Sequence, residues 1–358
     1  MKPLKPIFYV SVKTGNKGDD AIRASITSTI KKRINIPFSY FNVKYDRFTE
    51  QRIEQLNNDG SCLMIAGSGL YSNANTPSGW YFNCESELFS KIKVPIFLIG
   101  LGCNNNLSKD IFNGELNDKA KKSIKAINDL ATISTVRDQR TYDILKSIGI
   151  NKHELMLDPA CFFKVSNIKK EKRVAINIAQ HSPILGRFDG GIEGKKQRQK
   201  NINLFVNISN WLISKKYSIV FIAHDALEQS LIIDLQKQIP KLEWLNTDNI
   251  NTILTEYSKC SFSIAMKMHS NILSFSSKTP FISLYYDIKS PEFLKMINYA
   301  EFGKSIFEAD IKWLKERIYT IETYKEYFSF LLNEKKIYYQ PKFNNLINKI
   351  CNIIKIIN

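Results

Sequence analysis

The sequence predicts a soluble α/β protein with two doubly wound, parallel-sheet domains and a cleft between them. The length of 358 residues is comfortable for two domains. Short apolar runs alternate with helix-length amphipathic stretches, stop at a polar segment near 164–172, and then start again. Nearly continuous apolar strands, each followed by a helix, are typical of a parallel sheet that is covered on both faces.

Five strands and five helices are predicted before the polar segment. The strands are expected at 7–12, 38–43, 62–66, 96–99 and 132–136. The helices are expected at 20–33, 49–56, 85–91, 118–130 and 139–148. Thr49 suits the N-cap of the second helix, because its hydroxyl can accept a hydrogen bond from a backbone N–H of the first turn.

The same alternation continues after the polar segment. The strands are expected at 174–178, 219–223, 262–266 and 281–285, and the helices at 202–214, 226–238, 249–257, 270–276, 291–298 and 311–332. The tail has apolar residues at helical spacing, which predicts a closing helix packed on the core, with a helix on a membrane surface as the alternative. We expect an N-terminal domain at 1–165, a C-terminal domain at 166–330 and a closing helix at 331–358.

The charge of the chain favours an anionic partner. Lysine and arginine number 51 against 34 acidic residues, which gives a formal net charge of +17. Phosphates, nucleic acid and anionic membranes all suit such a charge, although the joint abundance of Lys, Ile and Asn also fits a bias in codon usage. The basic residues are spread along the chain, and no zinc-finger, RNP or helix-turn-helix signature is present, so nucleic acid is not expected.

The cysteines and the apolar runs indicate where the protein works. Six cysteines are widely scattered without a CxxC pair, which predicts reduced, mostly buried thiols. The N-terminal residues lack the pattern of a signal peptide, and the apolar runs fall far short of the ~20 residues that span a bilayer. We therefore expect a cytoplasmic protein, with peripheral contact at the inner face of an anionic membrane as a further possibility.

Candidate site residues follow the predicted strands, because ligands of open α/β sheets bind beyond the carboxyl ends of the strands. Gly15 to Asp20 follow the first strand, and the free N–H groups of the next helix suit an anion. Asp19 or Asp20 can cap that helix, which leaves the other as a base. Gly69 and Gly102 lie in Gly-x-Gly turns after the third and fourth strands, where a ligand can approach the backbone. Neither a GxGxxG nor a P-loop pattern is present.

Cationic side chains follow three further strands. Arg137 can bind a carboxylate or phosphate through two parallel hydrogen bonds, or can form a structural ion pair with Asp138. His269, at the start of a helix, can serve as a general acid or as a hydrogen-bonded structural histidine. Together with Lys289 these side chains would form a cationic site if they meet at one edge. The basic, glycine-containing stretch 180–200 is either a lid or a solvated loop.

The ordered motifs of this chain resemble those of the polysaccharide pyruvyltransferase family. The resemblance covers most of the chain, from Asn16 to Lys289, and no single motif is decisive. The matching pieces are Asn16-Lys17-Gly18-Asp19 with Ala21-Ile22, Gly67-Ser68-Gly69-Leu70, Gly100-Leu101-Gly102, Thr135-Val136-Arg137-Asp138, Asp158-Pro159-Ala160, Lys267-Met268-His269, Pro280, Tyr286-Asp287 and Lys289.

The resemblance implies a GT-B-like fold, with two Rossmann-like domains and the active site between them, the N-terminal domain on the acceptor side and the C-terminal domain on the donor side. It implies transfer of a pyruvyl group from phosphoenolpyruvate to two hydroxyls of a cell-surface saccharide, often lipid-linked, with no cofactor and no metal. Arg137, His269 and Lys289 match the functional positions of the family. Lys267 stands where the family often has arginine; it keeps the charge but loses the bidentate fork.

This chemistry assigns a role to each candidate residue. Arg137 and Lys289, assisted by Lys267 and by the backbone at the Gly69 and Gly102 turns, would hold phosphoenolpyruvate. His269 would protonate its methylene carbon. Asp19 or Asp20 would take a proton from the sugar. Two alternatives remain: a GT-B glycosyltransferase that uses a nucleotide sugar, and a non-catalytic relative that binds an anion or a glycan.

Overall fold

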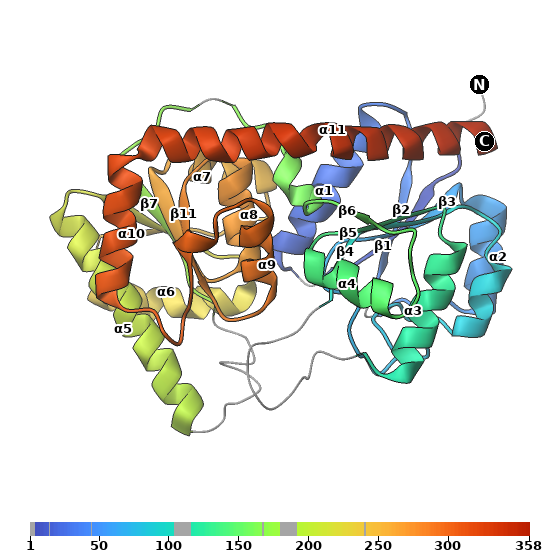
Figure 1. Cartoon of the computed structure of the whole chain (residues 1–358), viewed down its shortest axis with the longest axis horizontal. Helices are drawn as coiled ribbons and strands as arrows, with labels where there is room; N and C mark the ends of the chain where they lie inside the picture. Colours follow the sequence, from blue (N-terminus) through green and yellow to red (C-terminus); the bar gives the residue numbers. More distant parts are fainter. Residues whose placement is uncertain are drawn as a thin grey trace.

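The computed structural model describes residues 4–13, 15–43, 45–103, 116–166, 168–179, 192–239 and 241–358. Two α/β halves lie beside each other, and one long helix runs along both (Figure 1). Of the basic stretch predicted at 180–200, residues 180–191 lie outside the described residues, and 192–200 belong to a helix.

The first half contains a six-stranded parallel sheet in the order β2-β1-β3-β4-β5-β6. Its strands are β1 (Ile7–Ser11), β2 (Phe38–Asn42), β3 (Cys62–Ala66), β4 (Ile96–Leu101), β5 (Ile133–Val136) and β6 (Glu154–Leu155). Its helices are α1 (Lys17–Lys31), α2 (Glu50–Asp59), α3 (Asp118–Leu130) and α4 (Gln139–Ser147), with 3-10 helices η1 (Ser86–Lys91) and η2 (Pro159–Phe162).

The second half contains another six-stranded parallel sheet, in the order β12-β11-β10-β7-β8-β9. Its strands are β7 (Arg173–Asn177), β8 (Ser218–Ile222), β9 (Leu242–Leu245), β10 (Phe262–Ala265), β11 (Phe281–Tyr285) and β12 (Gly303–Ser305). Its helices are α5 (Ile192–Ser214), α6 (Ala226–Gln238), α7 (Ile250–Lys259), α8 (Met268–Ser276), α9 (Lys289–Met296), η4 (Ala300–Phe302), α10 (Ile311–Thr323) and α11 (Lys325–Ile357).

The two parallel sheets confirm the predicted architecture, and the differences have local causes. β6 and β12 are two and three residues long, and β9 has two exposed positions, so none of them forms the apolar run that predicts a strand. The helix predicted at 311–332 is two helices that meet at Tyr324. Thr49 caps α2 as predicted, because its side chain accepts from the N–H of Arg52.

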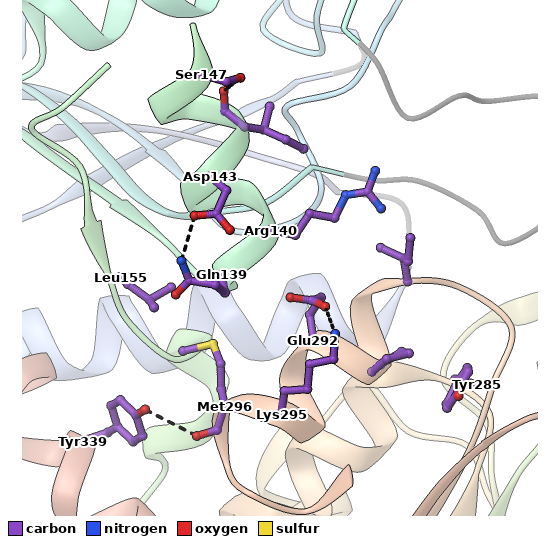
Figure 2. Close-up of a pocket in the computed structure, with 13 residues that line it drawn as sticks. Gln139, Arg140, Asp143, Ser147, Leu155, Tyr285, Glu292, Lys295, Met296 and Tyr339 are labelled. Carbon is purple, nitrogen blue, oxygen red and sulfur yellow. Dashed lines mark hydrogen bonds and ion pairs between the residues drawn. The ribbon is translucent and has the colours of Figure 1, made fainter. Parts of the chain in front are cut away.

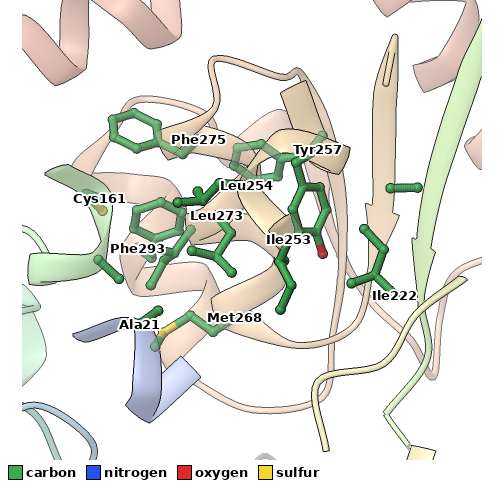
Figure 3. Packing of buried hydrophobic residues seen from close by; sticks show 14 of the residues in the cluster. Ala21, Cys161, Ile222, Ile253, Leu254, Tyr257, Met268, Leu273, Phe275 and Phe293 are labelled. Carbon is green, nitrogen blue, oxygen red and sulfur yellow. The ribbon is translucent and has the colours of Figure 1, made fainter. Parts of the chain in front are cut away.

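The hydrophobic core continues from one half into the other. One buried cluster combines residues of both halves, whereas a second cluster consists of first-half residues. Ala21 of α1 and Cys161 of η2 lie beside Met268 and Leu273 of α8 (Figure 3). All six cysteines are buried and free, which confirms the prediction of reduced thiols.

Helix α11 connects the end of the chain to its beginning. The 33-residue helix starts on the second half and ends on the first, close to the N-terminus (Figure 1). Phe343, Ile347, Ile350 and Ile354 of this helix are buried in the shared core. The tail therefore packs on the core, as the main prediction expected. Within the described residues, no helix is both long and apolar enough to cross a membrane.

Candidate active site

The connectivity of the two sheets creates a crevice in each half. In the first sheet the strand order reverses between β1 and β3, and in the second sheet it reverses between β7 and β10. At such a reversal the connections leave toward opposite faces, so a crevice opens beyond the carboxyl ends of the strands. The segments after β1 and β10 carry two of the predicted motifs, at 15–20 and at 267–269.

The first turn of α1 joins the first half to the second. Asn16 caps this helix by accepting from the N–H of Gly18, and the N–H of Lys17 donates to the carbonyl of His224 at 2.9 Å. A Cβ on Gly18 would lie 2.1 Å from Nδ1 and 2.2 Å from Cγ of His269. The Cα of Gly18 therefore packs against the imidazole ring, a contact that any side chain at this position would prevent.

A buried carboxylate joins His269 to Arg137. Nη1 of Arg137 donates to Oδ2 of Asp158 at 3.0 Å, and Nε2 of His269 lies 3.7 Å from the same oxygen. Burial acts to raise the pKa of Asp158, but the adjacent His269 and the charge of Arg137 outweigh it and hold this pKa below its usual value. Asp158 is therefore an anion at neutral pH, shared by residues of both halves.

The two Gly-x-Gly turns predicted after β3 and β4 lie against each other. The N–H of Gly102 donates to the carbonyl of Ser68 at 3.0 Å, and the N–H of Tyr71 donates to the carbonyl of Gly102 at 3.1 Å. The carbonyl of Gly69 accepts from the hydroxyl of Ser72. A Cβ on Gly102 would lie 2.7 Å from Nε of Arg137, so this glycine leaves the space that the guanidinium occupies.

The partner of Arg137 differs from the one suggested by the sequence. The side chain of Asp138 caps α4 by accepting from the N–H of Thr141 at 2.7 Å, whereas Arg137 pairs with Asp158. An ion pair between the neighbours Arg137 and Asp138 is therefore not what holds the guanidinium. Its partner comes from a residue 21 positions later in the chain.

The two aspartates of the first turn of α1 have different surroundings. Asp19 is buried, and burial raises its pKa, although His269, the Ser68 hydroxyl, Arg137 and Lys289 all act to lower it. Asp19 therefore belongs to the cluster around His269. The structure places Asp20 in an ion pair with Arg23, one turn along α1.

The prediction that one of these aspartates caps α1 is wrong. The helix begins at Lys17, three residues earlier than expected, and Asn16 is its N-cap. Both aspartates instead lie in the first turn, where their charge is favourable next to the positive end of the helix dipole.

Of the side chains of Arg137, His269 and Lys289, that of Lys289 is the most accessible to a ligand. Its side chain is 21% exposed, compared with 12% for His269 and 3% for Arg137. It begins α9, and its Nζ lies 3.0 Å from Oδ2 of the buried Asp287. One carboxylate contact leaves two further N–H donors on the ammonium group for a bound anion.

Lys267 is held by two carboxylates at the start of α6, those of the N-cap Asp225 and of Glu228 in the first turn. Its ammonium group contacts Asp225, and lies 2.8 Å from Oε1 of Glu228. Burial raises the pKa of Glu228, against the effect of Lys267. The backbone N–H of Lys267 donates to Oδ1 of the buried Asn177 at the end of β7. The charge of Lys267 is thus balanced within the second half.

The buried polar residues near the site that were not assigned a role from the sequence include Asp158, Asp287 and Asn177. Asp158 and Asp287 stand within motifs of the family resemblance, and that position is the signal that could have identified them. Nothing in the sequence around Asn177 distinguishes it from an ordinary residue at a strand end.

A cavity of about 1010 Å³ lies between the two halves. It is bounded by α4, α9 and Tyr339 of α11 (Figure 2). Its lining residues Gln139 and Ile288 are neighbours in sequence of Asp138 and Lys289, and the cluster residues Arg137, Asp158 and His269 are not part of the lining. Its lining combines the polar Arg140, Glu292 and Lys295 with aromatic and aliphatic side chains.

The chain matches a known protein family by sequence. The sequence profile described as "Polysaccharide pyruvyl transferase" matches residues 16–288, which include Gly18, Arg137, Asp158 and His269. Lys289 lies one residue beyond the match. No curated protein matches the chain significantly by sequence.

Several solved structures share the fold at low sequence identity. UDP-GlcNAc 2-epimerase of Neisseria meningitidis has a TM-score of 0.53 and 12% identity, covering 92% of this chain and 94% of that chain. A putative UDP-N-acetylglucosamine 2-epimerase of Listeria monocytogenes has a TM-score of 0.56 and 7% identity, covering 92% and 91%. An O-GlcNAc transferase of Thermobaculum terrenum has a TM-score of 0.51 and 10% identity, covering 99% and 68%. These similarities confirm the predicted GT-B fold.

Proposed function

The chain belongs to the polysaccharide pyruvyl transferase family, and on that premise we propose that it transfers the pyruvyl group of phosphoenolpyruvate to two hydroxyls of a saccharide. The product is a cyclic ketal, formed during synthesis of a cell-surface polysaccharide. The observation that carries the proposal is the meeting of Arg137 and His269, from the two halves of the molecule, at Asp158, with the buried Asp19 near enough to feel the charges of His269, Arg137 and Lys289.

The donor needs cationic groups for its carboxylate and its phosphate. Arg137 uses Nη1 for Asp158, and a guanidinium has further N–H donors in a planar fork that suits such oxyanions. Lys289 is the more accessible of the two cations, with a side chain that is 21% exposed. We assign both side chains to phosphoenolpyruvate. Lys267, with its charge balanced by Asp225 and Glu228, is assigned to holding the adjacent turn.

The reaction requires one proton donor and one proton acceptor. In the proposed scheme His269 gives a proton to the methylene carbon, Asp19 takes the proton of the attacking hydroxyl, and a C–O bond forms at C2. The second hydroxyl then attacks C2, its proton restores His269, and the C2–O bond to phosphate breaks. The proton held by Asp19 leaves with the phosphate. A raised pKa makes the buried Asp19 a stronger base than an exposed aspartate.

We place the acceptor in the cavity between α4 and α9. A volume of about 1010 Å³ can hold a short saccharide, since ligand pockets commonly span 300–1,000 Å³. Arg140, Glu292 and Lys295 offer hydrogen bonds to hydroxyls, and Tyr285 and Tyr339 offer flat apolar faces to sugar rings. We propose that the acceptor is lipid-linked and that the enzyme works in the cytoplasm at the inner face of the membrane.

The donor half of the proposal is tested by binding. Phosphoenolpyruvate at 100 times its dissociation constant should stabilise the protein by ~2.7 kcal/mol, which a thermal shift detects. Arg137→Lys should remove most of this shift. Arg173→Lys is the matched control, because Arg173 is a half-buried arginine that pairs with Glu243 and Glu256 at the start of β7, away from the cluster.

The complete reaction is tested by release of phosphate. Protein with phosphoenolpyruvate should release phosphate when a suitable saccharide is added, either lipid-linked or as a soluble analogue. Stabilisation by UDP-sugars and none by phosphoenolpyruvate would instead support the nucleotide-sugar glycosyltransferase. Binding of an anion with unchanged function of a His269→Ala variant in cells would support the non-catalytic relative.

A further inference from the structure

We propose that Asp158 is the positioning residue of this site: one carboxylate oxygen orients both the imidazole of His269 and the guanidinium of Arg137. The inference rests on the proposed pyruvyl transfer for its kinetic consequences. Its structural content, which is the orientation of the ring, can be tested without any turnover.

The backbone fixes the orientation of the Asp158 carboxylate. Asp158 is the N-cap of η2, and its Oδ1 accepts from the N–H of Ala160 at 2.9 Å. Pro159 occupies the first position of η2, where its ring restricts the backbone. The residue is 2% exposed. With Oδ1 engaged by the chain, Oδ2 is the oxygen that faces the side chains of Arg137 and His269.

Oδ2 of Asp158 lies between two residues that come from different halves. Nη1 of Arg137, from the segment after β5, is 3.0 Å away, and Nε2 of His269, from the first turn of α8, is 3.7 Å away. Nε2 is buried and has no hydrogen-bond partner among the described residues. Catalytic hydrogen bonds are often long without a substrate and shorten when it binds. Oδ2 of Asp158 is therefore the acceptor that we assign to a proton on Nε2.

The opposite side of the ring is also fixed. Gly18 packs against Nδ1 and Cγ of His269, as the 2.1 Å and 2.2 Å approaches of a Cβ placed there demonstrate. Asp158 on one side and Gly18 on the other leave the ring little freedom to turn. When Nε2–H faces Asp158, Nδ1 becomes the nitrogen that exchanges a proton with the substrate.

A role limited to folding would not require this arrangement. The ion pair with Arg137 lies within the first half and by itself would stabilise only that half. The approach of His269 brings a residue of the second half to the same oxygen. Asp158 therefore makes the orientation of the proposed acid depend on the relative position of the two halves, which is what a positioning residue between two domains has to do.

The kinetic test compares Asp158→Asn with Asp158→Glu. The asparagine keeps the size and an oxygen for the Ala160 N–H, but loses the charge. We expect kcat to fall by about 10- to 100-fold, the range typical of residues that orient a functional ligand. Glutamate should restore part of kcat. Glu256→Gln, which removes a carboxylate from the Arg173 pair, should stay within about twofold of the wild type.

A second measurement does not depend on activity. The chain has four histidines, so the ¹⁵N signals of His269 are identified by their loss in His269→Gln. In the wild type we expect the neutral ring to carry its proton on Nε2, and in Asp158→Asn we expect a mixture of tautomers. A wild-type ring protonated on Nδ1 overturns the proposal, even if Asp158→Asn fails to fold.

The two readouts separate this proposal from the proposed function. The wild type could show no turnover while its His269 carries the neutral proton on Nε2 and loses this preference in Asp158→Asn. That result would reject pyruvyl transfer and keep the positioning role. Normal turnover by folded Asp158→Asn, with an unchanged tautomer, would reject the positioning role and keep pyruvyl transfer.

Discussion

The Cα of Gly18 in the first half packs directly against the imidazole of His269 in the second half. A methyl group at residue 18 would stand 2.1 Å from Nδ1, so Gly18→Ala should force the ring out of its position. We expect a loss of at least about 100-fold in kcat, with a cost of about 1–3 kcal/mol in the free energy of unfolding. Steady-state kinetics and urea unfolding measure the two effects.

Gly149→Ala is the control for the effect that replacing a glycine has on the backbone. Gly149 has φ +81°, and the nearest atom to a Cβ there would be Cε of Lys125 at 3.7 Å. Gly149→Ala should cost about 1–2 kcal/mol of stability through backbone strain and leave kcat unchanged. Equal kcat in the two alanine variants would contradict the importance of the contact with His269.

Gly102→Ala should weaken the binding of phosphoenolpyruvate. The added Cβ would lie 2.7 Å from Nε of Arg137 and 3.2 Å from Oδ2 of Asp138, so the guanidinium has to move. We expect the dissociation constant to rise by about 10-fold or more, which corresponds to ~1.4 kcal/mol. Isothermal titration calorimetry measures it, and an unchanged constant would remove Arg137 from the donor site.

Lys267→Met should destabilise the second half strongly. The substitution removes the ammonium group next to the buried Glu228 and to Asp225. Loss of one partner of a buried ion pair typically costs about 3–5 kcal/mol. The double variant Lys267→Met/Glu228→Gln should recover part of that loss in urea unfolding. A loss below about 1 kcal/mol in the single variant would show that Lys267 has another role, such as direct contact with the donor.

Lys336 should make stability depend on pH in the alkaline range. This buried lysine of α11 donates to the carbonyls of Phe163 and Ser276, and burial lowers its pKa to about 8. Between about pH 8 and 10.5 the unfolded chain holds this proton more tightly than the folded protein, so this residue adds stability as the pH rises. The gain is about 3 kcal/mol at most, since one pKa unit corresponds to about 1.4 kcal/mol.

Two variants isolate the contribution of Lys336. Lys336→Met should lack this part of the pH dependence, whereas Lys342→Met, at an exposed position of the same helix, should keep it. Urea unfolding at several pH values gives the comparison. Identical profiles for wild type and Lys336→Met would show that the lysine keeps an ordinary pKa.

The sequence predicts which residues follow the strands, but it does not predict with which side chains those residues pair. Arg137, His269 and Lys289 were identified because the carboxyl ends of parallel strands collect polar residues on one side of a sheet. The choice of Asp158 over Asp138 as the partner of Arg137 depends on where η2 lies in space. The sequence pattern does not contain that position.

The relative position of the two halves explains most of the remaining differences. The contact between Gly18 and His269 joins residues about 250 positions apart, and periodicity within either half says nothing about it. The restraint of Lys267 by Asp225 and Glu228 depends similarly on the packing of the turn after β8 against the start of α8. The short strands β6, β9 and β12 escaped prediction because edge positions need no continuous apolar run.

The position of helix α11 has a consequence for folding of the protein during its synthesis on the ribosome. Arg33 at the end of α1 hydrogen-bonds Asn344 and Asn348, and Ile347, Ile350 and Ile354 complete the core that α1 shares. These residues of α11 are synthesised after both sheets. Domains usually fold in the order of synthesis, but here the half that emerges first is covered by a helix that follows the second half. The part of α1 that α11 covers therefore stays uncovered in the nascent chain until α11 has been synthesised.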